Sequence, residues 1–188
     1  MDKQLAKINS LLETLDAAAS EALDEISVHR TYAKGEYLLK AGSVCTKSFW
    51  IEQGMLRKFF MHKDKEVTTA FYFKDDIAIS FYSYTLQTPG TEYIQAMTET
   101  TVKETSYQQF GEGKRQHPAL LQLDLLLTEY YALSLEEKNF ELQTQNATQR
   151  YQTLLRKSPH IVLQVPLTHI ASYLNVSLET LSRIRSGI

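Results

Sequence analysis

The side chains best suited to a chemical task lie close together near the C-terminal end. They are polar or charged and stand on the outward side of a short apolar pattern: Glu179, Thr180, Ser182, Arg183 and Arg185. An arginine can donate two parallel hydrogen bonds to guanine or contact a phosphate, a glutamate can accept one from the amino group of cytosine, and serine or threonine can contact phosphates and base edges. On one face of a helix, this set has the chemistry to read the major groove of duplex DNA.

The surrounding residues predict a helix, a tight turn and a second helix. Apolar side chains recur at helical spacing in two runs, Leu167, Ile170, Ala171 and Leu174, then Leu178, Leu181 and Ile184. Between the runs, Asn175 tolerates the left-handed backbone that ends a helix, and Ser177 can cap the next helix by accepting from a free amide. The alternative that stays open is an ordinary helical hairpin that closes a core.

The run from Leu167 to Ile184 resembles the DNA-binding signature of the Crp/Fnr family of bacterial transcription regulators. The resemblance implies a helix-turn-helix whose DNA contacts come from Thr168, Ser177, Leu178, Glu179, Thr180, Ser182, Arg183 and Arg185. In the family an arginine usually stands where this chain has Leu178, which is suited at most to a thymine methyl. Glu179 and Arg183 fall on the other two base-reading positions.

The distribution of charge agrees with this interpretation. The net charge is -2, yet residues 150–188 carry five basic residues against one acid, which leaves residues 1–149 at -6. A local basic face is sufficient for phosphate contacts. The sequence stops at Ile188, where many relatives continue into a β-hairpin wing, so either this protein lacks the wing or the sequence is trimmed; without a wing, its contacts to phosphate would be missing.

Composition predicts a folded protein with one large or two small domains. Of 188 residues, 43% are hydrophobic, with only 7 Gly and 4 Pro. The single cysteine, Cys45, cannot form an intramolecular disulfide, and the chain has neither a signal-like N-terminus nor a run of about 18 apolar residues. These features favour a cytoplasmic location and no contact with a membrane.

The first part of the chain changes from helical to strand periodicity. Residues from Met1 to about Ser27 repeat apolar side chains at helical spacing. From Val28 to Phe110, short aromatic and β-branched runs alternate with turn signals, which predicts an antiparallel sandwich or barrel. Representative strands are Tyr37–Leu39, Ser48–Glu52, Met55–Met61, Glu66–Phe73, Tyr93–Ala96 and Thr100–Ser106.

This β segment also resembles the Crp/Fnr sensor, the β-roll that holds a cyclic nucleotide in its best-known members. Lys34–Leu38, Ala41–Gly42 and Phe49–Gly54 carry the resemblance. In the family, a Gly-Glu pair, a short helix and an Arg-Ser or Arg-Thr pair hold the phosphate. The matching positions here are Asp75 and Asp76, and Gly90 in place of the arginine.

The missing arginine predicts a sensor that does not respond to cyclic AMP. No Arg lies between Arg57 and Arg115, and two acids without a cation would repel a phosphate. We therefore expect a different small-molecule effector, or none. The candidate pocket residues are Phe73, Asp75, Asp76, Phe81, Gly90 and Thr91. The alternative is that the aromatic residues of this segment only fill the core.

From Gln116 onward, apolar residues recur at spacings that alternate between four and three residues. This spacing predicts a long helix with a coiled-coil seam. The family uses a helix in this position to form a two-fold dimer, so we expect the dimer interface at Leu123, Leu126, Tyr130 and Leu133. Polar residues at 137 and 144 indicate that the helix ends near Leu142, with a separate helix over Asn146–Lys157. The alternative is that the seam packs on its own β-roll.

Metal and enzyme chemistry have little support. One cysteine excludes an iron-sulfur cluster held by four, and the histidines at 29, 62, 117, 160 and 169 stand far apart without paired-ligand spacing. We expect no metal, no cofactor and no enzymatic activity.

The sequence thus predicts an α+β protein with a β-roll sensor and N-terminal helices over 1–115, a dimerisation helix over 116–143 and a helix-turn-helix domain over 144–188. The predicted function is transcriptional regulation by a homodimer bound to double-stranded DNA. The alternative function is a ligand-binding or protein-interaction module that has lost DNA binding.

Overall fold

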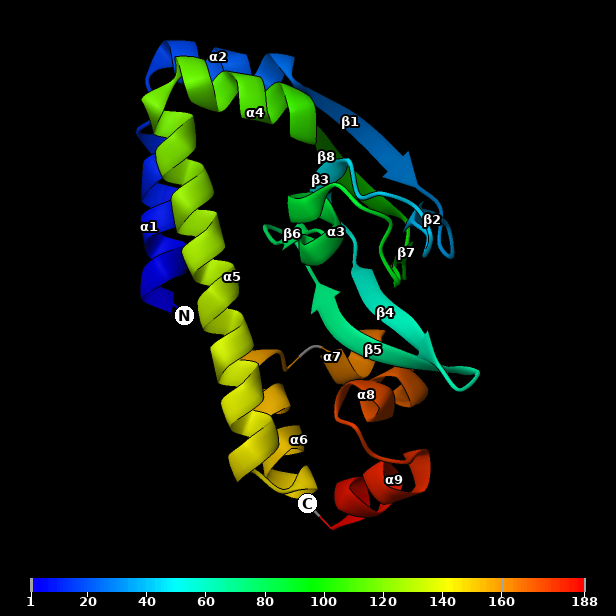
Figure 1. Ribbon diagram of the computed structural model, residues 1–188. Coiled ribbons are helices and arrows are strands. Elements are labelled where there is room, and N and C mark those ends of the chain that lie inside the picture. The colour runs from blue at the N-terminus through cyan, green and yellow to red at the C-terminus, as the bar shows by residue number, and fades with distance from the viewer. Residues whose placement is uncertain (1, 160, 188) are drawn as a thin grey trace.

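Two antiparallel sheets form the N-terminal half of the protein and enclose a common core (Figure 1). The computed structural model describes the backbone of residues 2–159 and 161–187, and the side chains of residues 7, 8, 10–159 and 161–187. Met1, His160 and Ile188, which also enter the sequence predictions, lie outside the described residues. The α+β fold class predicted from the sequence is confirmed.

Each sheet has four strands. One has the order β1-β8-β3-β6 and the other the order β2-β7-β4-β5, which leaves β5 at an edge. The strands are β1 Ser27–Tyr32, β2 Tyr37–Leu39, β3 Lys47–Gln53, β4 Leu56–His62, β5 Lys65–Tyr72, β6 Ile77–Ala78, β7 Glu92–Ala96 and β8 Thr100–Ser106. Inward side chains of both sheets, among them Phe49, Ile51, Leu56, Ile94 and Val102, form one buried cluster. Such burial is the main favourable term for a roll of this kind.

The turn between β3 and β4 depends on Gly54. Its φ is +93°, a left-handed conformation, and a Cβ at this position would lie 2.4 Å from the Glu99 carbonyl oxygen. Only glycine meets both conditions without strain, because it has no side chain to clash. The turn therefore packs directly against the backbone before β8.

The N-terminal helical prediction is confirmed in type and in approximate extent, and the segment divides into two helices. The chain forms α1 Asp2–Glu13 and α2 Ala17–Glu25, separated by a break at which Asp16 caps α2 by accepting from the Ala19 amide at 2.8 Å. The first strand, β1, begins at Ser27 and was not among the representative strands. Most side chains of β1 are exposed, so the strand lacks the alternation of buried and exposed residues that marks a half-buried strand.

The sensor connects to a long helix through a short one. After α3 Phe81–Leu86 and the last strands, α4 Tyr107–Gln116 leads into α5 Pro118–Thr144, with Pro118 in the first turn. Phe110 and Leu120 pack with Ala19 of α2, and α1 lies beside the N-terminal part of α5 (Figure 1). The predicted break is confirmed, since α5 ends at Thr144 and Asn146 caps the next helix in a capping box with Gln149.

Four helices complete the chain: α6 Ala147–Lys157, α7 Ile161–Gln164, α8 Leu167–Tyr173 and α9 Leu178–Ser186. Tyr151, Ile170, Leu174 and Leu181 are buried in their shared core, and Met55 of the sensor joins the same cluster. The C-terminal helices are therefore packed on the sensor (Figure 1). Among the described helices, none combines the length and the apolar character that crossing a bilayer requires.

Candidate nucleic-acid interface

The helix-turn-helix is built by local chemistry. Asn175 adopts a left-handed backbone with φ +55°, and the Val176 amide donates to the Ala171 carbonyl at 3.0 Å, which closes the turn. Ser177 then caps α9 by accepting from the Thr180 amide at 3.1 Å. Ile170 of α8 and Leu181 of α9 are each 0% exposed, so the orientation of one helix fixes the orientation of the other.

The opposite face of α9 is open to solvent. Seven of the eight predicted DNA-contacting residues are exposed: Thr168, Ser177, Leu178, Glu179, Ser182, Arg183 and Arg185. The eighth, Thr180, is half-buried, and its hydroxyl lies 2.9 Å from the Ser177 hydroxyl. Glu179 stands in the first turn and the two arginines in the last turn, where each charge agrees with the helix dipole.

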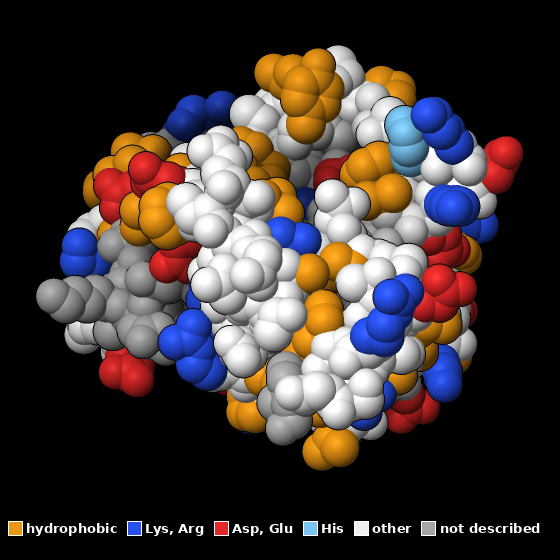
Figure 2. Space-filling model, turned by 90° about the horizontal axis from the view of Figure 1, so that it is seen from below, with side chains coloured by type: hydrophobic (Ala, Val, Ile, Leu, Met, Phe, Trp, Pro, Cys, Tyr) orange, Lys and Arg blue, Asp and Glu red, His pale blue; other side chains and the backbone are white. Residues whose placement is uncertain are grey.

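Not every basic residue of the C-terminal segment can contact a phosphate. Arg150 donates to the Leu174 carbonyl at 3.1 Å and to the Gln145 carbonyl at 2.7 Å, so it holds the end of α8 in place. Lys157 bonds to Glu137 and Glu141 of α5. Arg156 donates to the Thr153 hydroxyl at 3.0 Å, so three of the five basic residues counted in the sequence are hydrogen-bonded within the protein. Figure 2 shows the end of the molecule that carries α9, where Lys and Arg side chains are dispersed among uncharged and acidic ones.

The predicted effector residues do not gather around one cavity. Asp75 and Asp76 lie in the turn between β5 and β6, where Asp76 accepts from the Phe73 amide at 2.8 Å. Burial raises the pKa of the Asp76 carboxyl above its usual range. Asp75 and Asp76 therefore serve the turn in this structure.

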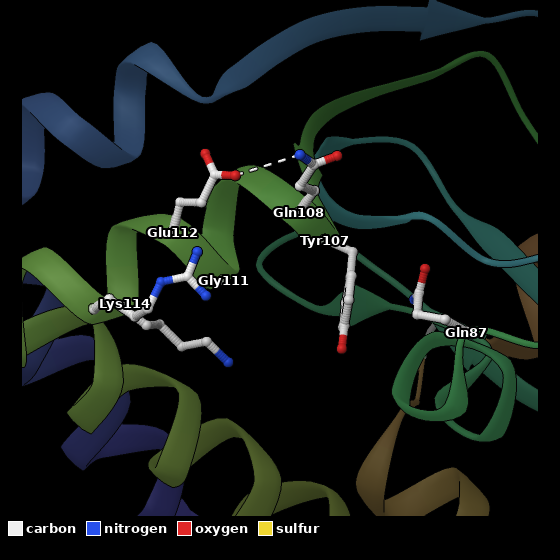
Figure 3. Close-up of a pocket in the computed structure, with 7 residues that line it drawn as sticks. Gln87, Tyr107, Gln108, Gly111, Glu112 and Lys114 are labelled. Atoms are coloured by element: carbon white, nitrogen blue, oxygen red, sulfur yellow. Dashed lines mark hydrogen bonds between the residues drawn. The ribbon is translucent and has the colours of Figure 1, made fainter.

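The other effector candidates lie around α3. Phe81 stacks on Tyr131 of α5, with ring centroids 4.2 Å apart. Gly90 packs close to Ser83, because a Cβ on Gly90 would lie 3.0 Å from the Ser83 Cβ. Thr91 is exposed. A cavity of about 420 Å³ does lie nearby, between Gln87 and the α4 residues Tyr107, Gly111 and Lys114, but none of the six predicted residues lines it (Figure 3).

Sequence reasoning missed a charged cluster inside the sensor. The ammonium group of Lys58 lies 3.5 Å from Glu92 Oε1 and donates to the Ile79 carbonyl at 3.3 Å, and the Ser80 hydroxyl donates to Glu92 Oε2 at 2.6 Å. Lys58 is buried although it belongs to the apolar run of β4. Its ammonium also lies 5.7 Å from the centre of the Tyr131 ring. The only sequence signal was a lysine within a strand that is otherwise largely apolar.

The four predicted dimer residues have different environments. Leu123 is only 4% exposed and packs within its own chain, Leu126 and Tyr130 are half-buried, and Leu133 is exposed. A second row of α5 side chains is exposed throughout its length: Leu121, Leu125, Thr128, Ala132, Leu135, Asn139 and Leu142. We call this row the outer seam; its residues also follow one another at spacings that alternate between four and three residues.

In the described part of the chain, no three His, Cys, Asp or Glu side chains are grouped as a metal site would require.

These elements define a class of protein: a β-roll sensor joined by a long helix to a helix-turn-helix. No protein-family model matches the sequence, and a search of curated proteins finds no significant match. FixK2 from Bradyrhizobium japonicum matches the structure with a TM-score of 0.73 at 16% identity, over 86% of this chain and 84% of its own. The protein therefore has the fold of the Crp/Fnr-type regulators, as the sequence resemblance predicts.

Two further structures give the same result. A protein from Eubacterium rectale, described as a transcriptional regulator of the Crp/Fnr family, matches with a TM-score of 0.72 at 15% identity, over 93% of this chain and 83% of its own. The c-di-GMP-responsive global regulator CLP from Xanthomonas campestris matches with a TM-score of 0.69 at 14% identity, over 92% of this chain and 91% of its own. At such identities, the likeness establishes the fold.

Proposed function

We propose that this protein is a bacterial, cytoplasmic transcription regulator of the Crp/Fnr type that binds duplex DNA as a homodimer and has no enzymatic activity. The observation that carries the proposal is the open face of α9, which presents Glu179 and Arg183 to solvent on a rigid helix-turn-helix. The fold supports it, since two of the matching structures are named as regulators. The proposed domains are residues 1–115, 116–143 and 144–188.

In this proposal the exposed face of α9 enters the major groove. Arg183 donates to guanine or a phosphate, Glu179 accepts from cytosine, and Leu178, which is 44% exposed, contacts a thymine methyl. Thr168 on α8 and Ser177 at the start of α9 contact the flanking phosphates, since the first helix of such a motif crosses the backbone. Thr180, Ser182 and Arg185 complete the contact surface.

The outer seam supports the homodimer. Leu121 and Leu125 are each 57% exposed, and Leu135 is 52% exposed, which is unusual for leucines on a helix of a free monomer. The alternating spacing places Leu121, Leu135 and Leu142 at d positions and Asn139 at an a position of a heptad repeat. An asparagine at a favours two parallel strands. A parallel pair of α5 helices would place two α9 helices on one side, as reading two half-sites requires.

This interface differs in residues from the one expected from the sequence. Leu126, Tyr130 and Leu133 stand on the neighbouring side of α5, and Leu133 borders the outer seam. In the proposed dimer these three residues flank the interface between the two α5 helices. Leu123 is buried and packs α5 against its own chain.

The buried cluster supports a sensor that does not respond to cyclic AMP. Glu92 places a carboxylate beside Ser80 and the N-terminus of α3, and Lys58 already neutralises it. A phosphate entering there would have to displace Glu92 from Lys58, because this carboxylate already holds the ammonium group. An effector of another chemical class remains part of the proposal.

DNA binding is tested with the purified protein and random-sequence duplex DNA, by fluorescence polarisation at about 50 mM and about 200 mM salt. We expect binding at the lower salt concentration and a steep loss at the higher one. Absence of binding at low salt would leave the second candidate function, a protein-interaction module. The internal engagement of Arg150 and Lys157 favours that candidate, because it reduces the positive charge available to DNA.

A further inference from the structure

The edge of the sensor sheet is closed by a side chain of the helix-turn-helix. Strand β5 has only β4 as a neighbour in its sheet, so the outer backbone groups of β5 have no strand to pair with. Ser172 of α8 replaces that strand: its hydroxyl accepts from the Thr68 amide at 2.9 Å and donates to the Glu66 carbonyl at 2.8 Å. These two hydrogen bonds use the single donor of the Ser172 hydroxyl and one of its acceptor lone pairs.

A second contact joins α8 to the neighbouring strand β4, one turn earlier on α8. Arg57 of β4 is 1% exposed, and its Nη1 atom donates to His169 Nδ1 at 2.6 Å. Its Nη2 atom donates to Glu66 Oε2 at 2.6 Å and to Gln95 at 3.3 Å. A guanidinium group can only donate, so His169 Nδ1 must carry no proton in this arrangement.

This geometry makes the contact sensitive to protonation of His169. The charged groups that act on the imidazole are Arg57 from β4 and Glu66 from β5, and α8 has no other charged residue. Burial and the Arg57 guanidinium lower the pKa of His169 below its usual value of 6.5, with Glu66 opposing them. Protonation would remove the acceptor and place a second cation against a guanidinium that has little access to water.

We propose that Arg57, Glu66, His169 and Ser172 form a proton-sensitive latch that holds the helix-turn-helix on the edge of the sensor and opens in acid. The docked state binds neutral His169, so its stability is full above the usual histidine pKa and decreases as the pH falls below it. The effect of the latch on DNA rests on the proposed function. Two α9 helices read two half-sites only while their orientation is fixed, so an open latch lowers DNA affinity.

Amide hydrogen exchange at Thr68 measures the latch directly, because its N–H bonds to Ser172 across the contact. In the wild-type protein, we expect the protection factor of Thr68 to fall between about pH 7.5 and about pH 5.5, by at most about tenfold, because the uptake of one proton at a usual pKa of 6.5 limits the change. Ile94, in an inner strand of the same sheet, should keep its protection. Constant protection at Thr68 over this range would overturn the proposal.

His169→Gln is the decisive variant, since an amide oxygen can accept from Arg57 and does not titrate. Its Thr68 protection should stay high and independent of pH, whereas His62→Gln, on the exposed tip of the same hairpin, should behave as the wild type. Equal pH dependence in H169Q and wild type would overturn the latch. Ser172→Ala should lower Thr68 protection at every pH, which shows that the probe reports the contact.

DNA polarisation measured on the same samples separates the two proposals. If the protection factor of the Thr68 amide depends on pH but the protein binds no DNA at any pH, the latch proposal stands and the regulator proposal fails. DNA binding that is lost in acid by wild type and retained by H169Q supports both. If the protein binds DNA and the protection factor of Thr68 does not change with pH, only the latch proposal fails.

Discussion

The ammonium group of Lys58 lies 3.5 Å from the Glu92 carboxylate inside the sensor, and this pair links strands β4 and β7 to the segment before α3. Burying one charge without its partner is strongly unfavourable, so the two residues depend on each other. The Lys58 ammonium also approaches Tyr131 of α5, on which Phe81 stacks. The pair therefore connects the β-roll with the long helix.

We predict that Glu92→Gln lowers the free energy of unfolding by about 1–3 kcal/mol, because Lys58 remains buried without a counter-charge. The glutamine can still accept from Ser80, so the loss measures the charge pair. Urea unfolding followed by the fluorescence of Trp50, the only tryptophan, reports the sensor directly because Trp50 lies in β3. The exposed Glu99→Gln should change stability little, and a similar loss in both variants would contradict the interpretation.

The parts of the structure that the sequence predicted well are those fixed by neighbouring residues. The turn at Asn175 and the cap at Ser177 follow from the backbone preferences of each residue, so the helix-turn-helix was accessible from the pattern alone. The break between α5 and α6 was likewise marked by local polar residues.

The features that sequence reasoning missed depend on contacts between distant segments. The sequence contains two overlapping repeats on α5, and which of them is covered depends on α1 and the β-roll, which bury Leu123 and leave Leu125 exposed. Arg57 and Lys58 stand between Leu56 and Phe59 in β4, but their neighbours in the sequence do not identify the distant partners with which both are buried and paired. Tertiary packing decides these positions, and periodicity alone does not report it.

Leu135→Lys should dissociate the proposed dimer. Each copy would lose a seam leucine worth about 1.5–3 kcal/mol, so the dissociation constant should rise by about 100-fold or more. Sedimentation velocity over a range of concentrations measures the change. The matched control is Leu163→Lys, which alters an 86% exposed leucine on α7 away from the outer seam. Dissociation by both variants, or by neither, would count against this interface.

Asn139→Leu tests the direction of the pairing. A polar residue at an a position costs stability and specifies two parallel strands, so its replacement should tighten association and permit larger assemblies. Sedimentation equilibrium should then show species beyond a dimer. A purely dimeric variant with unchanged affinity would mean that Asn139 does not face its equivalent.

Ser177→Ala should destabilise the C-terminal domain by about 1 kcal/mol, because the Thr180 amide loses its cap. The loss is measured by thermal unfolding, in which the midpoint shifts by a few degrees. Ser182→Ala, on the exposed face of the same helix, removes a hydroxyl that caps nothing in α9 and should leave the midpoint unchanged.

Arg183→Ala should weaken binding to a selected DNA site by about 1–3 kcal/mol, which is about 5- to 150-fold. If Arg183 reads guanine, the loss is confined to sites that carry that base, whereas a phosphate contact lowers affinity for all sequences and reduces the salt slope by about one. Polarisation with selected and scrambled duplexes distinguishes these cases. Lys34→Ala removes an exposed charge from the sensor and should have little effect, because at physiological salt its charge is screened beyond about 8 Å. Equal losses for the two variants would show that the effect is one of net charge, and that α9 does not enter the groove.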